Sequence, residues 1–293
     1  MKSKLITDAT IKYLMALTFI VFCFVAGVYF VYTYLPVRVD WVHNGPPQVG
    51  VDWKGAFRRA ALKMLAGESP YQITSFFNPP WTLFPLLPIA LLSPALGSAV
   101  MYVLNLFSYL FVAIKLKTNF WLIIVFVLLS NMILNSNNGN IEGILAIGFI
   151  LPPQIGLFFV LAKPQMGIAV AVFWAIESYR TGGLEKIIQV FLPVVLAYII
   201  SFVIFGVYIK NSVQLADVWW NSSIFPEGVP IGIILLGIAI WKREIKFAIA
   251  ASPFFATYLT PHTWAVVWLG LLSLFPQKIQ FKREEVVQFN NLP

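Results

Sequence analysis

Apolar residues form long runs that recur from residue 11 to residue 276, with short polar breaks between them. The first run, 13–35, is uninterrupted, and a membrane-spanning helix needs about 20 apolar residues. It follows Lys2, Lys4 and Lys12, and it is longer than the roughly 7–15 residues of a signal-peptide core. We therefore expect a retained first transmembrane helix with its N-terminus in the cytoplasm.

Eight further apolar segments follow a polar-bearing stretch at 36–93. In order they are 95–114, 120–134, 141–162, 165–178, 187–209, 229–241, 247–259 and 264–275. Several are too short for a lipid-exposed span, and Pro152 and Pro153 break one of them, so neighbouring helices should shelter them. The pattern predicts an all-α, polytopic transmembrane bundle of about ten spans, several of them short or broken. We interpret 1–293 as a single integral membrane domain, with an outer loop at 36–93, the remaining spans at 95–276 and a cytoplasmic tail at 277–293.

The outer loop contains two candidate interfacial segments. In the first, Trp53, Phe57, Ala60 and Met64 recur at helical spacing, and basic residues occupy the other directions. This pattern predicts a helix that lies in the plane of the membrane interface. The second segment, 81–92, is apolar but too short to span, so we expect an outer-surface or re-entrant segment.

Composition and charge agree with this picture. The chain is 59% hydrophobic and only 11% charged, against roughly 25% charged in soluble domains, which excludes a soluble globule. The net charge is +8, but thirteen of the twenty Lys and Arg fall on the predicted inner side and seven on the outer side. This distribution follows the positive-inside rule and argues against nucleic acid as a partner. One cysteine and two histidines exclude disulfides and make a Cys- or His-rich metal site untenable.

The polar residues that remain come from distant parts of the chain, yet the alternating topology places almost all of them on the outer side. They are Asp52, Asn78, the cluster from Asn135 to Asn140, Lys163, Asn221 and His262. An ionisable group at the membrane edge is costly and is a functional candidate by default. We therefore expect these residues to converge on one outer-side site.

Asp52 has two possible roles, because it immediately precedes the predicted interfacial helix. As an N-cap, its carboxylate would accept a backbone N–H of the first turn. As a general base, it would take a proton from a substrate hydroxyl. The two roles are compatible, and Asp40 in the same loop is a rival for the second.

The other candidates also have plain structural alternatives. Lys163 precedes Pro164 at an expected helix start, where a cation opposes the helix dipole, so an anionic group should compensate it unless the side chain snorkels to the interface. The Asn cluster is typical of a turn. Arg58 and Arg59 could contact anionic lipid headgroups, and His262 could cap the last span.

A series of motifs resembles one family of membrane enzymes. After Asp52, the outer loop holds Ala60, Ala61, Leu65, Gly67, Pro70, Tyr71, Pro79, Pro80 and Pro94. Later motifs are Gly139 with Asn140, Lys163 with Pro164, and Ser252 and Pro253 with Pro261, His262 and Trp264. Over residues 10–276 the chain resembles the polyprenol-phosphate-mannose-dependent alpha-mannosyltransferases, a family of the GT-C class. It departs from the family pattern at Asn78, where an aromatic is usual, at Asn140, where Gln is usual, and in the placing of the late histidine.

The resemblance implies an enzyme of the plasma membrane, with both termini cytoplasmic, that takes a sugar from a polyprenyl-phosphate donor. The sugar, mannose in this family, would pass with inversion to a hydroxyl of a lipid or glycan acceptor on the outer face. Asp52 would be the base. Phosphate ligands would be Lys163, His262 and either Arg58 or Arg59, and further substrate contacts would be Tyr71, Asn78 and Asn140. The sequence contains no DxD, P-loop or dinucleotide motif, so we expect no metal or other cofactor.

A polytopic transporter or lipid flippase is the alternative from another class, because short broken helices with polar groups near the midplane are typical of transporters. The sequence shows no inverted repeat, and its inner loops are short and basic, which favours the enzyme. A scaffold subunit without activity is a third hypothesis, and it predicts that Asp52 can be replaced freely.

Overall fold

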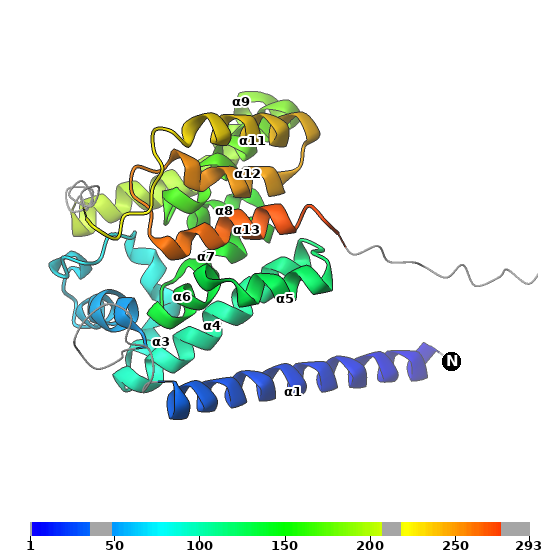
Figure 1. Ribbon diagram of the computed structural model, residues 1–293, viewed down its shortest axis with the longest axis vertical. Coiled ribbons are helices and arrows are strands. Elements are labelled where there is room, and N and C mark those ends of the chain that lie inside the picture. The colour runs from blue at the N-terminus through cyan, green and yellow to red at the C-terminus, as the bar shows by residue number, and fades with distance from the viewer. Residues whose placement is uncertain (1, 36–48, 207–217, 277–293) are drawn as a thin grey trace, which may run out of the picture.

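The computed structural model describes residues 2–35, 49–206 and 218–276, with side chains from residue 10 onward. Within these ranges every regular element is a helix, which confirms the expected all-α class (Figure 1). The α-helices are α1 (Lys2–Tyr34), α2 (Arg58–Leu65), α3 (Leu87–Ala90), α4 (Pro94–Lys115), α5 (Phe120–Leu128), α6 (Ser130–Asn138), α7 (Glu142–Ala146), α8 (Pro153–Val160), α9 (Pro164–Phe205), α11 (Val229–Lys242), α12 (Ile245–Ala251) and α13 (Ala265–Leu272). One short π-helix is η1 (Trp53–Phe57). Short 3₁₀ helices are η2 (Pro70–Gln72), η3 (Pro80–Leu86), η4 (Ile147–Ile150), η6 (Ser252–Phe255) and η7 (Pro261–Trp264).

Three helical segments of the described chain are long and apolar enough to cross a membrane: Thr10–Tyr34, Pro94–Lys115 and Pro164–Phe205. A fourth candidate is the pair α5 and α6, which the sequence pattern predicted as one span but which is bent by 60°. The bend lies at Leu129, whose backbone is extended and separates the apolar α5 from the polar α6. These helices identify a membrane protein, and the count of about ten spans stays a prediction.

Several predicted breaks are confirmed. The helix α9 is interrupted at Gly182 and Gly183, whose backbone angles are not helical, between the expected segments 165–178 and 187–209. The segment 141–162 is divided into α7, η4 and α8, and Pro153 occupies the first turn of α8. Proline suits a first turn because its fixed φ matches the helix and its missing N–H has no partner to lose there.

The core is one cluster that includes buried residues of α4, α7, α8, α12, α13 and the first half of α9. Helix α4 packs against α6 and α7, and α9 packs against α8 and α12. Helix α1 lies apart from this core along one side and packs against α4 (Figure 1). This contact includes Phe24 edge-on to Phe107 and buries Val31 and Val103, but most of the apolar side chains of α1 are exposed. The outward faces of α11 and of the second half of α9 are similarly apolar, as expected of surfaces that contact lipid. The buried residues of α12 and α13 fit the expectation that neighbours shelter short segments, whereas α11 is largely exposed.

A helix is present where the interfacial helix is predicted, as η1 followed by α2, and its position in the membrane interface stays a prediction. Its expected apolar face is buried, with Trp53 and Ala60 fully covered and Phe57 nearly so. The second loop segment, η3 and α3, buries Leu83 and Leu86 in the same core, and the choice between an outer-surface and a re-entrant segment stays open. The outer loop therefore folds back onto the bundle and contributes to its core.

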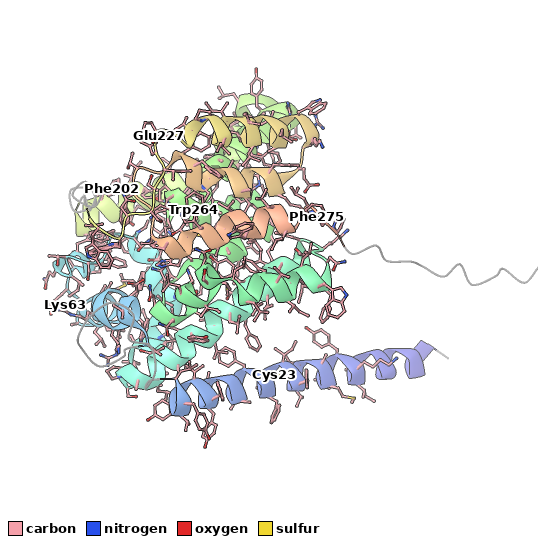
Figure 2. The ribbon with its side chains drawn as sticks, viewed as in Figure 1. Cys23, Lys63, Phe202, Glu227, Trp264 and Phe275 are labelled. Carbon is pink, nitrogen blue, oxygen red and sulfur yellow. The ribbon has the colours of Figure 1, made fainter. Side chains whose placement is uncertain are left out.

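Figure 2 shows which segments of the chain lie at each end of the bundle. Lys63 of the outer loop and Phe202 near the end of α9 lie at one end of the helices, and Phe275 after α13 lies at the other end, where α1 also begins (Figures 1 and 2). This arrangement agrees with the relative sides that the sequence pattern predicts for these three segments.

Candidate functional site

A cavity of about 720 Å³ lies at the end of the bundle that carries the outer loop. Its volume falls within the ~300–1,000 Å³ range of small-molecule sites. Its walls come from the outer loop, Asn140, both halves of α9 and the segment after η6. The lining residues are Asp52, Ala56, Phe57, Ser75, Phe77, Asn78, Asn140, Ala162, Lys163, Pro164, Gln165, Ile168, Tyr198, Phe202, Phe255, Ala256, Thr257, Tyr258 and Thr260. Asp52, Asn78, Asn140 and Lys163 therefore meet at one cavity, as predicted, and the outer position of this cavity stays a prediction.

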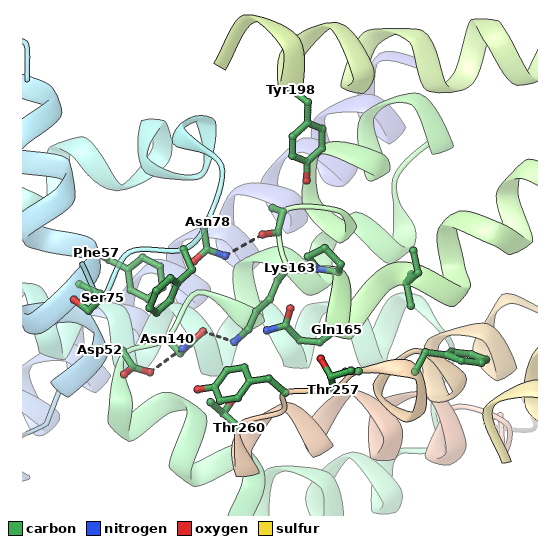
Figure 3. Close-up of a pocket in the computed structure, with 18 of the residues that line it drawn as sticks. Asp52, Phe57, Ser75, Asn78, Asn140, Lys163, Gln165, Tyr198, Thr257 and Thr260 are labelled. Carbon is green, nitrogen blue, oxygen red and sulfur yellow. Dashed lines mark hydrogen bonds between the residues drawn. The ribbon is translucent and has the colours of Figure 1, made fainter. Parts of the chain in front are cut away.

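Asp52 is half-buried on the wall formed by the outer loop (Figure 3). It makes no side-chain capping hydrogen bond to the helix that begins beside it, so the structure does not support the N-cap alternative. Its Oδ2 instead accepts a 2.7 Å hydrogen bond from the side-chain amide of Asn140. In the described part of the chain this is the carboxylate's one hydrogen bond, so Asp52 keeps acceptor capacity for a ligand.

Asn140 links the carboxylate to a cation. It follows Gly139, which ends α6 in the left-handed conformation with φ 64°, and its backbone oxygen accepts from the Asn105 side chain. The amide nitrogen of Asn140 donates to Asp52, and its Oδ1 accepts from Lys163 Nζ at 3.4 Å (Figure 3). The two neighbours thus fix the orientation of the amide, because the carboxylate only accepts and the ammonium only donates.

Lys163 immediately precedes α9, as predicted, and its side chain is almost fully buried. The anionic partner that its position required is Glu142, at the first turn of α7, which is fully buried and ion-paired with Lys163 Nζ. The Glu142 carboxylate also accepts from the Thr263 hydroxyl and, at 2.7 Å, from the Asn135 amide. A buried ion pair is tolerated when such additional hydrogen bonds satisfy its oxygens.

His262 lies behind this pair and does not line the cavity. Only 2% of its surface is exposed, and its Nε2 is 2.9 Å from the Thr260 hydroxyl and 3.6 Å from Glu142 Oε1. Burial lowers the pKa of His262, and Lys163 acts in the same direction, against the Glu142 and Asp52 carboxylates, which raise it. The geometry therefore gives His262 a supporting position and no direct contact with a ligand in the cavity.

Asn78 and Tyr71 shape the loop wall of the cavity. The Asn78 amide donates to the backbone oxygen of Ala162 at 2.9 Å and so ties the outer loop to the residue before Lys163 (Figure 3). The Tyr71 hydroxyl donates to the backbone oxygen of Asn78 at 3.2 Å, but Tyr71 is not a lining residue. Asn78 can contact a ligand, and Tyr71 acts through Asn78.

Neither Arg58 nor Arg59 lines the cavity, in contrast to the phosphate role that the resemblance implies for one of them. Arg58 points toward α3 and donates to the backbone oxygen of Leu92 at 3.3 Å. Arg59 borders a separate shallow depression beside the 2.6 Å ion pair of Lys63 and Glu68. The rival base Asp40 lies outside the described residues.

Sequence reasoning missed Glu142, Gln165 and Tyr258. A signal for Glu142 existed, because an isolated acidic residue in an apolar segment is costly unless it has a partner, and Lys163 needed one. Tyr258 is a half-buried phenol on the cavity wall that accepts from the Trp220 indole at 3.2 Å.

In the described ranges, no group of three or more His, Cys, Asp or Glu side chains is arranged to hold a metal ion. No protein-family model matches the chain, and searches among curated proteins and solved structures found no match to it. The arrangement itself presents one carboxylate, one paired ammonium and several neutral donors to a cavity that is otherwise apolar and aromatic.

Proposed function

We propose that this protein is a membrane glycosyltransferase that moves a hexose, with mannose as the first candidate, from a polyprenyl-phosphate donor to a lipid or glycan hydroxyl. One observation supports this function above others: Asp52 and Lys163 line one cavity and are separated by the single amide of Asn140. Glycosyl transfer from a phosphate needs a carboxylate for the acceptor's proton and hydrogen-bond donors for the leaving group. Both occur here within one site.

In the proposed reaction, Asp52 takes the proton of the acceptor hydroxyl as its oxygen attacks the anomeric carbon. The bond between that carbon and the phosphate oxygen breaks, and its electron pair leaves with the phosphate. The ammonium of Lys163 carries three N–H donors, of which Glu142 and Asn140 occupy two, so one remains for a phosphate oxygen. Attack from the Asp52 side and departure on the Lys163 side invert the sugar.

The apolar walls of the cavity support a lipid-linked donor. Ile168, Tyr198, Phe202 and Phe255 line it together with the polar groups. Tyr198 and Phe202 belong to the second half of α9, whose other face carries exposed apolar side chains. We propose that the carrier's hydrocarbon chain lies on this side, where membrane lipid meets the cavity wall.

The finer topology is part of the same proposal. The cavity opens to the outer face of the plasma membrane, both termini are cytoplasmic, and the shorter helices complete about ten crossings in the shelter of their neighbours. The basic residues near Lys115, Arg180 and Lys242 then lie inside, as the positive-inside rule requires.

The purified protein in liposomes, supplied with a radiolabelled polyprenyl-phosphate mannose and a mixture of glycolipid acceptors, tests the proposal. We expect label to appear in a new glycolipid, with release of the polyprenyl phosphate. Movement of intact donor between leaflets, without any labelled product, would instead support the transporter or flippase alternative.

A further inference from the structure

Three charged side chains lie close together at the polar end of the cavity: Asp52 and Lys163 line it, and the buried Glu142 is ion-paired with Lys163 behind the cavity wall. One cation can therefore pair with either of two carboxylates. The titratable side chains of Tyr258, on the wall, and of the buried His262 are neighbours of these charged groups. Lys163 is ion-paired with Glu142, and the described part of the chain shows no ion pair between Lys163 and Asp52. The carboxylate with which Lys163 pairs therefore determines whether the Asp52 carboxylate faces the cavity without a paired cation.

Glu142 is held in place by several elements at once. Its Oε2 accepts from Asn135 of α6 at 2.7 Å, and its Oε1 accepts from Thr263 of η7 as well as from Lys163. No part of Glu142 is exposed, so its carboxylate has little freedom to move. Glu142 is therefore a fixed anchor, whereas the four-carbon stem of a lysine is flexible.

Asp52 is the competing partner, and it is close. A single amide, that of Asn140, bridges it to Lys163 through hydrogen bonds of 2.7 and 3.4 Å. An ammonium without a counter-ion in this setting would be attracted to the nearest carboxylate. Its positive charge would stabilise the ionised form of Asp52 and make the carboxylate a weaker base.

We propose that Glu142 is a positioning residue that holds the Lys163 ammonium away from Asp52 and so keeps the Asp52 carboxylate free to accept a proton from a ligand. The role of Asp52 as a base rests on the proposed function, but the charge arrangement itself does not. With the charge of Glu142 removed, Lys163 neutralises Asp52, and protonation of Asp52 requires a lower pH.

Dicyclohexylcarbodiimide, an apolar reagent that adds to protonated carboxyl groups, measures this directly. The purified full-length protein is treated across a pH series without donor or acceptor, and mass spectrometry follows the modification of Asp52. In Glu142→Gln, we expect half-modification about one pH unit lower than in the wild type, the lower end of the effect of an adjacent opposite charge. The double variant Glu142→Gln/Lys163→Met lacks the cation, so its pH of half-modification should return to within about 0.3 pH units of the wild-type value.

The matched control is Glu177→Gln, which removes a carboxylate paired with Arg180 at 2.5 Å elsewhere on α9 and should leave the modification of Asp52 unchanged. If Glu142→Gln does not fold, Glu142→Asp keeps both charges but shortens the anchor by one methylene, and a smaller shift in the same direction is expected. An unchanged half-modification point in the folded variants overturns the proposal and makes Glu142 a purely structural counter-ion. Because no substrate is present, failure of glycosyl transfer with the shift intact would refute the proposed function alone.

Discussion

The side-chain amide of Asn140 donates a 2.7 Å hydrogen bond to the carboxylate of Asp52, although 88 positions separate the two residues. This bond joins the outer loop to the segment between α6 and α7, and the same amide accepts from Lys163 on its other side. A carboxylate and an ammonium are thereby kept in one cavity without contact between them. The proposed role of Asp52 as a base and the proposed role of Glu142 as a positioning residue both depend on this separation.

Lys163→Met should destabilise the protein by roughly 3–5 kcal/mol, because it leaves the buried carboxylate of Glu142 without its counter-ion. The double variant Glu142→Gln/Lys163→Met should recover most of the loss, since neither charge remains buried alone. Denaturant unfolding in mixed micelles measures the free energy of unfolding of both variants. A single variant as stable as the wild type would show that the pair does not exist in the membrane protein.

Gly139→Ala should be more destabilising than its matched control Gly67→Ala. Both glycines have a positive φ, at 64° and 75°, so each substitution carries about 1–2 kcal/mol of backbone strain. A Cβ at Gly139 would also lie 2.9 Å from Cβ of Trp53, next to Asp52, whereas a Cβ at Gly67 would meet nothing within 4 Å. We expect Gly139→Ala to cost at least about 1 kcal/mol more in unfolding free energy. Equal costs would contradict the close packing of Gly139 on the helix of Asp52.

Stability should decrease as the solution becomes acidic, in part through His262. Burial lowers the pKa of His262 in the folded protein below its usual 6.5, so the unfolded chain binds this proton more readily. The stability contributed by neutral His262 is complete above pH 6.5 and is lost as the pH falls below it toward the folded-state pKa. His262→Asn should therefore show a smaller loss of thermal midpoint between pH 7.5 and pH 5.5. An identical pH dependence in the two proteins would show that His262 is not the titrating group.

Much of the fold could be predicted because helical periodicity and helix-start signals are local properties of the chain. The first helix, the buried face of Trp53 and Phe57, and the helix start after Lys163 all follow from short-range patterns. The interruption at Gly182 was expected for the same reason. The bend between α5 and α6 was missed because a continuous apolar run does not report one extended residue, Leu129.

The candidate site could be predicted only in part. Charge balance required an anionic partner for Lys163, but which carboxylate supplies it depends on how α7 packs beside the start of α9. The directions of Arg58 and Arg59 also depend on tertiary packing, since the rotation of α2 against the core determines which side chains reach the cavity. Side-chain direction relative to a distant element is not encoded in spacing alone.

The sidedness of the membrane domain can be tested by cysteine labelling in a Cys23→Ser background, because Cys23 is the chain's single cysteine. Thr74 and Thr181 are both exposed, and we propose that they lie on opposite sides of the membrane. An impermeant maleimide added to intact cells should label Thr74→Cys and spare Thr181→Cys until the membrane is opened. Labelling of Thr181→Cys in intact cells would reverse or refute the topology.

The most direct measurement of the central claim is glycosyl transfer by purified Asp52→Asn, with Asp40→Asn as the control from the same outer loop. The amide keeps the size of the side chain and can still accept from Asn140, so folding and donor binding should persist, but it cannot take a proton. We predict that Asp52→Asn loses at least ~100-fold in turnover, the lower end of what a positioned base contributes, while Asp40→Asn remains active. Near-normal transfer by Asp52→Asn together with loss of transfer in Asp40→Asn would contradict the account.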